Sequence, residues 1–262
     1  MAQLPLLPAG PIATAVSRLM RTGGGESPDP AAFLADLLDL KGGVTLSDAL
    51  ADLPPPGGAL PTTDAAGALI LRMRDEIVAL SGRLDDAVLN AYRARYRLPG
   101  PVRAHVLLDQ AGALAPKRTP RTVISASRTL WAPYADFLET HLKRARFGLR
   151  DLRTELGPRL QALGPSSDRL ERLDAALQAS TAVEVERLLR RGLHGVEDRF
   201  LDGLKSALKA LPKTPAAADL EPWYTSDGFV TQVFDDGCRL VQGIFAHERS
   251  RLEMLVHAAT FG

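Results

Sequence analysis

Apolar residues recur along the middle of this 262-residue chain at the spacing of an α-helix. From Leu138 the next apolar positions follow at steps of 4, 3, 4, 3 and 4 residues: Leu142, Ala145, Leu149, Leu152 and Leu156. A seven-residue repeat keeps its apolar stripe turned toward one neighbouring helix, with a left-handed twist, as in a coiled coil. The pattern therefore predicts a long helix that packs along its length.

A second long helix follows, and its apolar residues have a different period. From Val185 they recur in an eleven-residue pattern at Leu189, Leu193, Val196, Phe200, Leu204, Ala207 and Leu211. Between the two patterns we expect Gly164 to end the first helix and Ser166, Ser167 or Asp168 to cap the second. Because this turn is short, the two helices must run antiparallel, as a hairpin over about 128–211.

Two helices with unequal apolar periods cannot share one stripe along their whole length. The second half of the second helix therefore needs another cover, which is either a third helix of this chain or a partner chain. The final helix, from about Phe229 to Ala258, is the internal candidate. Val196, Phe200 and Leu204 are the predicted partner-binding residues, and Phe200→Asp is expected to disrupt either the hairpin or the partner contact.

Proline- and glycine-rich stretches divide the chain into segments, because they support neither helix nor sheet. We expect a small N-terminal helical region at 1–53, a linker at 54–63, a helix at 64–97, a Pro-rich connector at 98–125, a hairpin spine at 126–211, a linker at 212–226 and a C-terminal helix at 227–262. The predicted fold class is all-α: an elongated helical bundle built on the long hairpin, with short N-terminal helices and a C-terminal helix.

The charges are unevenly distributed, although the net charge is only +1. Residues 66–125 hold ten basic and five acidic residues, whereas residues 1–65 hold three basic and seven acidic ones. Either the acidic ends fold back onto the basic middle, or this middle is a face for an acidic partner or a membrane surface. The small net charge makes a dedicated nucleic-acid binder the less favoured alternative, which would use the Arg-rich region 93–121.

Cysteine content and hydropathy bear on the compartment. The single Cys238 excludes an internal disulfide and any zinc site made of cysteines, and it fits a reducing cytosol. No stretch approaches the roughly 18 apolar residues of a membrane span. Prolines interrupt the apolar start of the chain and no basic residue precedes it, so we expect no signal peptide and a cytoplasmic protein.

No catalytic, cofactor-binding or metal site is predicted. His194 and Glu197 are spaced to share a metal, but the chain lacks the repeated Glu-x-x-His motif of di-metal bundles. Cys238 follows two aspartates, which raise the pKa of a thiol and disfavour a nucleophile. The glycines inside the second helix, Gly192, Gly195 and Gly203, have two readings: close approach of another helix, or tolerance on an exposed face.

One part of the hairpin resembles a known family. The segment reads RLERLDAALQASTAVEVERLLRRGLHGVEDRFLDGL, and its Leu173, Leu177, Arg187 and Leu189 are similar to the central motif of an uncharacterised bacterial domain of unknown function. AHERSRLEML near the C-terminus resembles the same family. The resemblance implies that the protein is encoded beside ion-driven motor-channel-like and outer-membrane peptidoglycan-binding-like proteins, and it implies no catalytic residue.

The pattern and the resemblance together lead to one functional expectation. We expect a non-enzymatic structural or adaptor protein that binds other proteins, or itself, through helical seams. Its expected setting is a cytoplasmic accessory of a bacterial envelope complex, with only indirect contact to the membrane.

Overall fold

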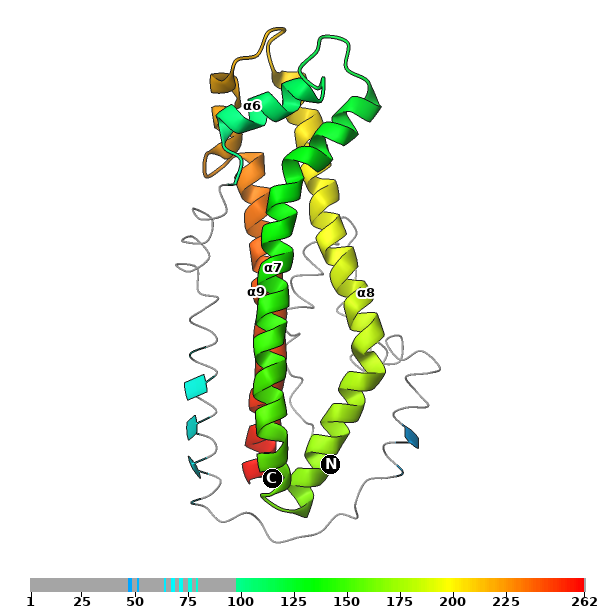
Figure 1. Ribbon diagram of the computed structural model, residues 1–262, viewed down its shortest axis with the longest axis vertical. Helices are drawn as coiled ribbons and strands as arrows, with labels where there is room; N and C mark the ends of the chain where they lie inside the picture. Colours follow the sequence, from blue (N-terminus) through cyan, green and yellow to red (C-terminus); the bar gives the residue numbers. More distant parts are fainter. Residues whose placement is uncertain are drawn as a thin grey trace, which may run out of the picture. The chain divides into compact units, whose positions relative to one another are not determined.

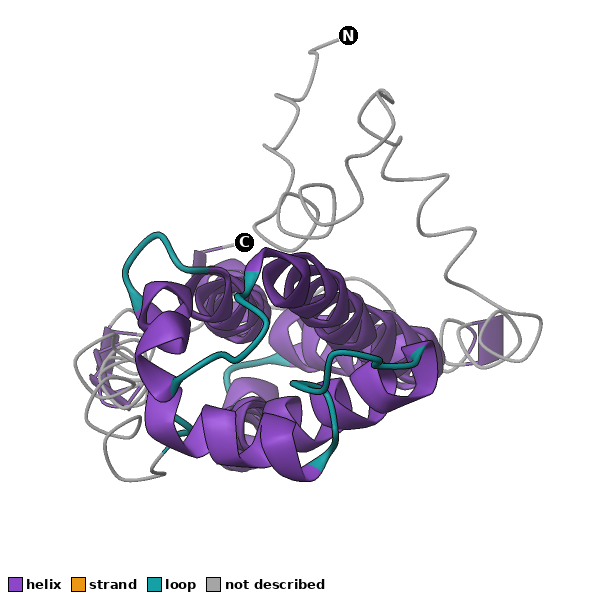
Figure 2. Ribbon diagram, turned by 90° about the horizontal axis from the view of Figure 1, so that it is seen from above, coloured by secondary structure: helices purple, strands orange, loops and turns teal. Residues whose placement is uncertain are grey.

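A computed structural model describes residues 98–261 as one continuous stretch, together with isolated helical positions between 47 and 79 (Figure 1). The elements of the continuous stretch are α6 (Pro101–Gln110), α7 (Pro120–Gln161), α8 (Pro165–Ala210), the 3-10 helix η1 (Ala217–Tyr224) and α9 (Phe229–Phe261). Figure 2 shows this described part as helices and loops without a strand. The all-α prediction is confirmed.

The predicted N-terminal elements lie mostly outside the described residues. In the predicted helix 64–97, the described positions up to 79 are helical. Its apolar stripe and the helices expected within 1–53 fall almost entirely on residues that the structure does not describe.

The α7–α8 turn forms where the hairpin was predicted, and its geometry explains the sharp reversal. Gly164 has a φ of 147°, a backbone conformation that glycine adopts readily. Pro165 takes the first helical position, where its missing N–H costs nothing. The Asp168 amide donates to the Gly164 carbonyl at 3.0 Å and so closes the first turn. The expected cap at Ser166, Ser167 or Asp168 is wrong, because all three lie inside α8.

The predicted connector at 98–125 contains more helix than expected. Pro101 begins α6, which packs on η1 through a buried face that includes Leu108. α7 then begins at Pro120, where Thr119 and Thr122 cap each other: each backbone amide donates to the other residue's hydroxyl, at 3.0 and 3.2 Å. This stretch is therefore not a loose linker.

The chain forms two compact units. Unit 1 comprises Met1–Arg83, Arg144–Arg190 and Gly243–Gly262, and unit 2 comprises Leu84–Lys143 and Arg191–Gln242. Each of the three long helices contributes a part to both units. The residues of each unit are therefore far apart in the sequence.

Unit 2 has a core of aromatic side chains. Phe200 of α8 lies with its ring 4.8 Å from that of Trp131 and 5.6 Å from that of Phe229. Phe234 of α9 packs edge-on against Tyr134, at 5.2 Å between ring centres. Such ring pairs add about 0.5–1.5 kcal/mol each beyond the area that they bury. Three helices are thereby fixed around one cluster.

Unit 1 has an aliphatic core between α7 and α9. It consists of Leu152, Leu156, Leu160, Leu252, Leu255 and Val256, all nearly inaccessible to solvent. Leu163 and Leu170, from either side of the hairpin turn, pack against this cluster and are only partly buried. The six positions of the predicted heptad stripe, Leu138 to Leu156, are all buried. The stripe was therefore predicted correctly.

Candidate functional site

The predicted partner-binding residues belong to the core of unit 2. Val196, Phe200 and Leu204 each have 0% of their surface exposed. The aromatic rings around Phe200 come from α7 and α9 of the same chain. An exposed partner surface at these residues is therefore wrong: helices of this chain supply the cover, which is the internal alternative stated above.

Two of the three α8 glycines allow α9 to approach closely. A Cβ added to Gly203 would lie 2.6 Å from Cδ2 of Phe229, and one added to Gly192 would lie 3.1 Å from Cδ2 of Leu240. A Cβ on Gly195 would meet nothing within 4 Å. The close-approach reading holds for Gly192 and Gly203, and the tolerance reading holds for Gly195.

Asp174 of α8 is a mostly buried charged group of unit 1, with its side chain 14% exposed. Arg251 of α9 binds its Oδ1 through Nε at 2.7 Å and Nη2 at 2.6 Å, and Arg153 of α7 binds its Oδ2 at 2.5 Å. The Arg251 guanidinium also donates to the Asp174 backbone carbonyl at 3.1 Å. One carboxylate thus connects three helices.

A second ionic contact joins the same helices. Arg146 of α7 donates to Glu186 of α8 at 2.7 Å and lies 3.4 Å from Glu248 of α9. The hydrogen bond from Arg146 lowers the pKa of Glu186. Burial raises the pKa of Glu248, and Arg146 only partly opposes that rise. Within unit 1, these charges therefore add to the apolar contacts of α8, which include that of Leu170 with the aliphatic core.

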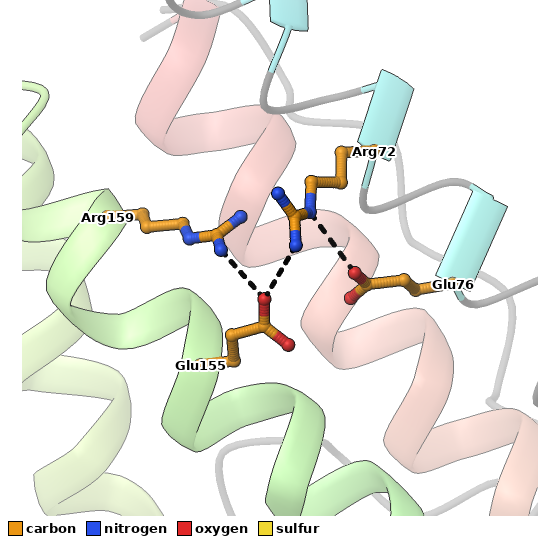
Figure 3. Close-up of polar contacts among 4 residues, drawn as sticks. All are labelled: Arg72, Glu76, Glu155 and Arg159. Carbon is orange, nitrogen blue, oxygen red and sulfur yellow. Dashed lines mark hydrogen bonds and ion pairs between the residues drawn. The ribbon is translucent and has the colours of Figure 1, made fainter.

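A third contact links a described N-terminal position to α7. Glu155 accepts from Arg72 at 3.2 Å and from Arg159 at 2.7 Å, and Arg72 also bonds Glu76, as Figure 3 shows. These side chains are about half exposed, and exposed pairs of this kind contribute roughly 0–1 kcal/mol each. This contact is a surface attachment with no catalytic geometry.

Three further polar features lie among the described residues. A small open depression in unit 1 is lined by Arg153, Thr154, Gly157, Pro158, Gln161 and Glu171, and Gln161 donates to Glu171 across it. The His194–Glu197 pair is on the surface at 3.4 Å, and no metal-binding group of three exists among the described residues. Cys238 is a buried free thiol.

Phe147 of α7 is a surface feature that the apolar pattern did not single out. Its side chain is 63% exposed, and it is the one exposed aromatic residue among those whose burial the structure describes. It lies about half a helical turn away from the buried face that includes Ala145 and Leu149. Its position opposite the heptad stripe was the available signal in the sequence.

The second surface feature is a set of basic side chains in unit 2. Arg103, Lys117, Arg121, Lys209 and Lys213, here called the basic end, are all exposed. None of them has an ion-pair partner among the residues that the structure describes. Arg103 and Arg121 belong to the predicted Arg-rich region 93–121, of which residues 93–97 lie outside the described part.

No helix in the described stretch is both long enough and apolar enough to cross a bilayer. Comparison with family models, curated proteins and solved structures finds no match. The resemblance to a bacterial domain of unknown function therefore stays a prediction.

Proposed function

We propose that this protein is a non-enzymatic helical adaptor that binds another protein through the outer face of α7 in unit 1. The proposed setting is cytoplasmic, as an accessory of a bacterial envelope complex. The buried free thiol of Cys238 is compatible with a reducing compartment. The contact surface differs from the one predicted from sequence, because the seam residues of α8 are covered by this chain.

The exposure of Phe147 carries this proposal. Aromatic and arginine side chains dominate the binding energy of protein interfaces. The helix neighbours of Phe147 at i−3, i+3 and i+4 are Arg144, Arg150 and Asp151, and all are exposed. A partner that buries the phenyl ring would meet these charged groups as a polar rim around it.

The use of the charged side chains supports a non-enzymatic role. Asp174, Glu186 and Glu248 are carboxylates that arginines hold between α7, α8 and α9 in unit 1. Such groups stabilise packing and are not free to exchange protons with a substrate. A catalytic carboxylate would instead face an open pocket, where a substrate can reach it.

Affinity capture with paired variants tests the proposal. The tagged full chain is expressed in its native host, and the captured proteins are identified for the wild type, Phe147→Ala and Val183→Ala. Val183 is the matched control, because it is also an exposed apolar residue of unit 1, at 74%. We expect one partner that Val183→Ala retains and Phe147→Ala loses, with an affinity roughly 30-fold lower for the purified pair.

Self-association is measured on the same samples, because a second copy of the chain is one form of partner. Sedimentation velocity of the purified wild type and Phe147→Ala detects it. If Phe147→Ala keeps the same partners and the same association state as the wild type, the α7 face is not the binding surface and the proposal is wrong.

A further inference from the structure

We propose that the basic end of unit 2 binds the surface of a membrane that contains anionic phospholipid. This inference goes beyond the adaptor role, which depends on Phe147 in unit 1, and it concerns different residues. The contact is peripheral: side chains would reach the headgroups and the upper acyl region without crossing the bilayer.

The structure holds the segments of the basic end together. Arg118 in the α6–α7 loop donates from Nη2 to the Leu208 carbonyl, near the end of α8, at 2.6 Å. His105 of α6 lies 2.9 Å from the carbonyl oxygen of Pro215, two residues beyond Lys213. In Figure 1, α6, the loop after it and the loop after α8 gather at the same end of unit 2.

The charge balance at this end is strongly positive. Residues 98–128 contain five Lys and Arg residues and one acidic residue, Asp109, and residues 205–216 contain three lysines and no acidic residue. Two neighbouring carboxylates are already engaged: Asp202 pairs with Lys205 at 2.8 Å, and Asp219 accepts from the Ala216 amide at 2.7 Å. Within these two segments the basic side chains therefore outnumber the carboxylates.

Helix capping explains only part of this excess. Lys209 is in the last turn of α8, where a cation is favourable beside the negative end of the helix dipole. Arg118 satisfies a carbonyl at the same end. Neither reason applies to Lys117, Arg121 or Lys213, which are exposed in loops or at a helix start. Their charge remains available for an anionic partner.

Exposed aliphatic side chains beside these cations favour lipid as the partner. Val102 is 71% exposed and Val106 is 47% exposed, one turn apart on α6, and Arg103 shares their face. Ile124, at 38%, follows Arg121 by three residues on α7. Basic residues beside apolar ones are the composition of surfaces that sit at a membrane interface, where the valines leave water while the cations meet phosphates. Asp109 is the single opposing charge on this face of α6.

Nucleic acid would use the same cations but not the valines. A phosphodiester backbone offers little apolar surface for Val102 and Val106, and single strands are held by aromatic side chains on which bases stack. Among the described aromatic residues of unit 2, Trp131, Tyr134 and Trp223 are buried. The surface therefore matches a lipid headgroup layer better than a nucleic acid.

Vesicle co-sedimentation with the full-length chain tests the proposal. The vesicles contain phosphatidylcholine with phosphatidylglycerol, or phosphatidylcholine alone, at physiological ionic strength. The test variant is Lys117→Gln/Arg121→Gln/Lys213→Gln. The matched control, Lys143→Gln/Arg190→Gln/Arg239→Gln, removes the same charge from side chains that are 78%, 78% and 72% exposed elsewhere. The apolar variant is Val102→Ser/Val106→Ser, with Val183→Ser as its control.

We expect the wild type to bind only the vesicles that contain phosphatidylglycerol. The test variant should partition roughly 100-fold more weakly, because each basic residue near an anionic surface contributes several-fold. The apolar variant should partition about tenfold more weakly. Both controls should bind as the wild type does, since charges farther away than about 8 Å are screened. Far-UV circular dichroism checks the fold of each variant, and single substitutions replace the triple one if that variant unfolds.

Three results would overturn the proposal. The first is equal binding to both vesicle types, or to neither of them. The second is wild-type binding by the apolar variant, because contact with lipid requires the valines. The third is release from vesicles by random-sequence duplex DNA that binds the chain more tightly, which would make nucleic acid the partner of the basic end.

Discussion

Arg251 of α9 contacts two groups of Asp174 in α8. It pairs with the Asp174 carboxylate at 2.6 Å and donates a hydrogen bond to the Asp174 backbone carbonyl at 3.1 Å. Arg153 of α7 takes the other carboxylate oxygen. The Asp174 side chain is only 14% exposed, so its charge depends on these arginines for compensation. Within unit 1, one aspartate therefore fixes how three helices meet.

Replacing Asp174 by Asn should destabilise the protein by about 2–3 kcal/mol, because two guanidinium groups would then face a neutral amide in a mostly buried place. The loss stays below that of a fully buried pair, since Arg251 is 29% exposed. Urea unfolding followed by circular dichroism measures the change. Asp202→Asn is the control, because Asp202 is 74% exposed and pairs only locally with Lys205, so its effect should be within about 0.5 kcal/mol. Equal effects of the two substitutions would contradict the role given to Asp174.

The apolar helices were predictable from sequence, whereas the ionic contacts between them were not. Helical period reveals a buried stripe within one helix, and the Leu138 to Leu156 stripe is buried as expected. Asp174 and Arg251 are 77 residues apart, and no periodic signal pairs one charge with another at that distance. Without knowledge of the partner helix, charged residues on a helix are interpreted as its solvent-exposed face.

The predicted binding surfaces show the same difference: the apolar stripe was predictable from sequence, but what covers it was not. Val196, Phe200 and Leu204 were correctly identified as an apolar stripe that needs a cover, but sequence alone left open whether this chain or another provides it. Short elements such as α6 gave too few turns for a clear period, and the four prolines between residues 98 and 122 made the stretch resemble a linker. The exposure of Phe147 depends on which faces α8 and α9 cover, so it emerged only with the fold.

The glycines of α8 give opposite predictions for the same substitution. Gly203→Ala should destabilise unit 2 by about 1–2 kcal/mol, because the new methyl group would meet the Phe229 ring at 2.6 Å. That ring is held by Trp223 and Phe200, so it cannot simply move away. Gly195→Ala has open space and should instead stabilise α8 by about 0.5–1 kcal/mol. Thermal unfolding of both variants measures these stability changes. If both variants were destabilised, or both stabilised, the different packing given to Gly203 and Gly195 would be wrong.

Phe200 and Phe147 provide a matched pair of aromatic truncations. Phe200→Ala should cost about 3–5 kcal/mol, since the ring is fully buried among three other aromatic side chains. Because Phe200 lies against Trp131, the tryptophan fluorescence of the folded variant should also shift. Phe147→Ala removes an exposed ring and should change stability by no more than about 0.5 kcal/mol. Comparable losses in urea unfolding would mean that Phe147 is not on the surface.

The contacts of Arg146 predict a pH-dependent effect on stability. Its hydrogen bond lowers the pKa of Glu186 below the ordinary 4.5. The folded state then binds fewer protons than the unfolded state, so this stabilisation is complete above pH 4.5 and disappears as the pH falls through the lower, folded pKa. Arg146→Gln should therefore weaken the protein most at neutral pH, and the difference from the wild type should shrink on acidification through this window. Glu248 acts in the same direction, because without Arg146 its raised pKa would rise further.

Urea unfolding of the wild type and Arg146→Gln at a series of pH values, from neutral to below the ordinary pKa of a glutamate, measures this convergence. Lys205→Gln serves as the control, because its partner Asp202 is 74% exposed and the pair should add little at any pH. If the difference between the wild type and Arg146→Gln stayed constant on acidification, Arg146 would act through packing of its aliphatic stem and not through the two carboxylates. A difference that grew would show that protonated Glu186 or Glu248 is the better partner for Arg146, which reverses the charge argument made for unit 1.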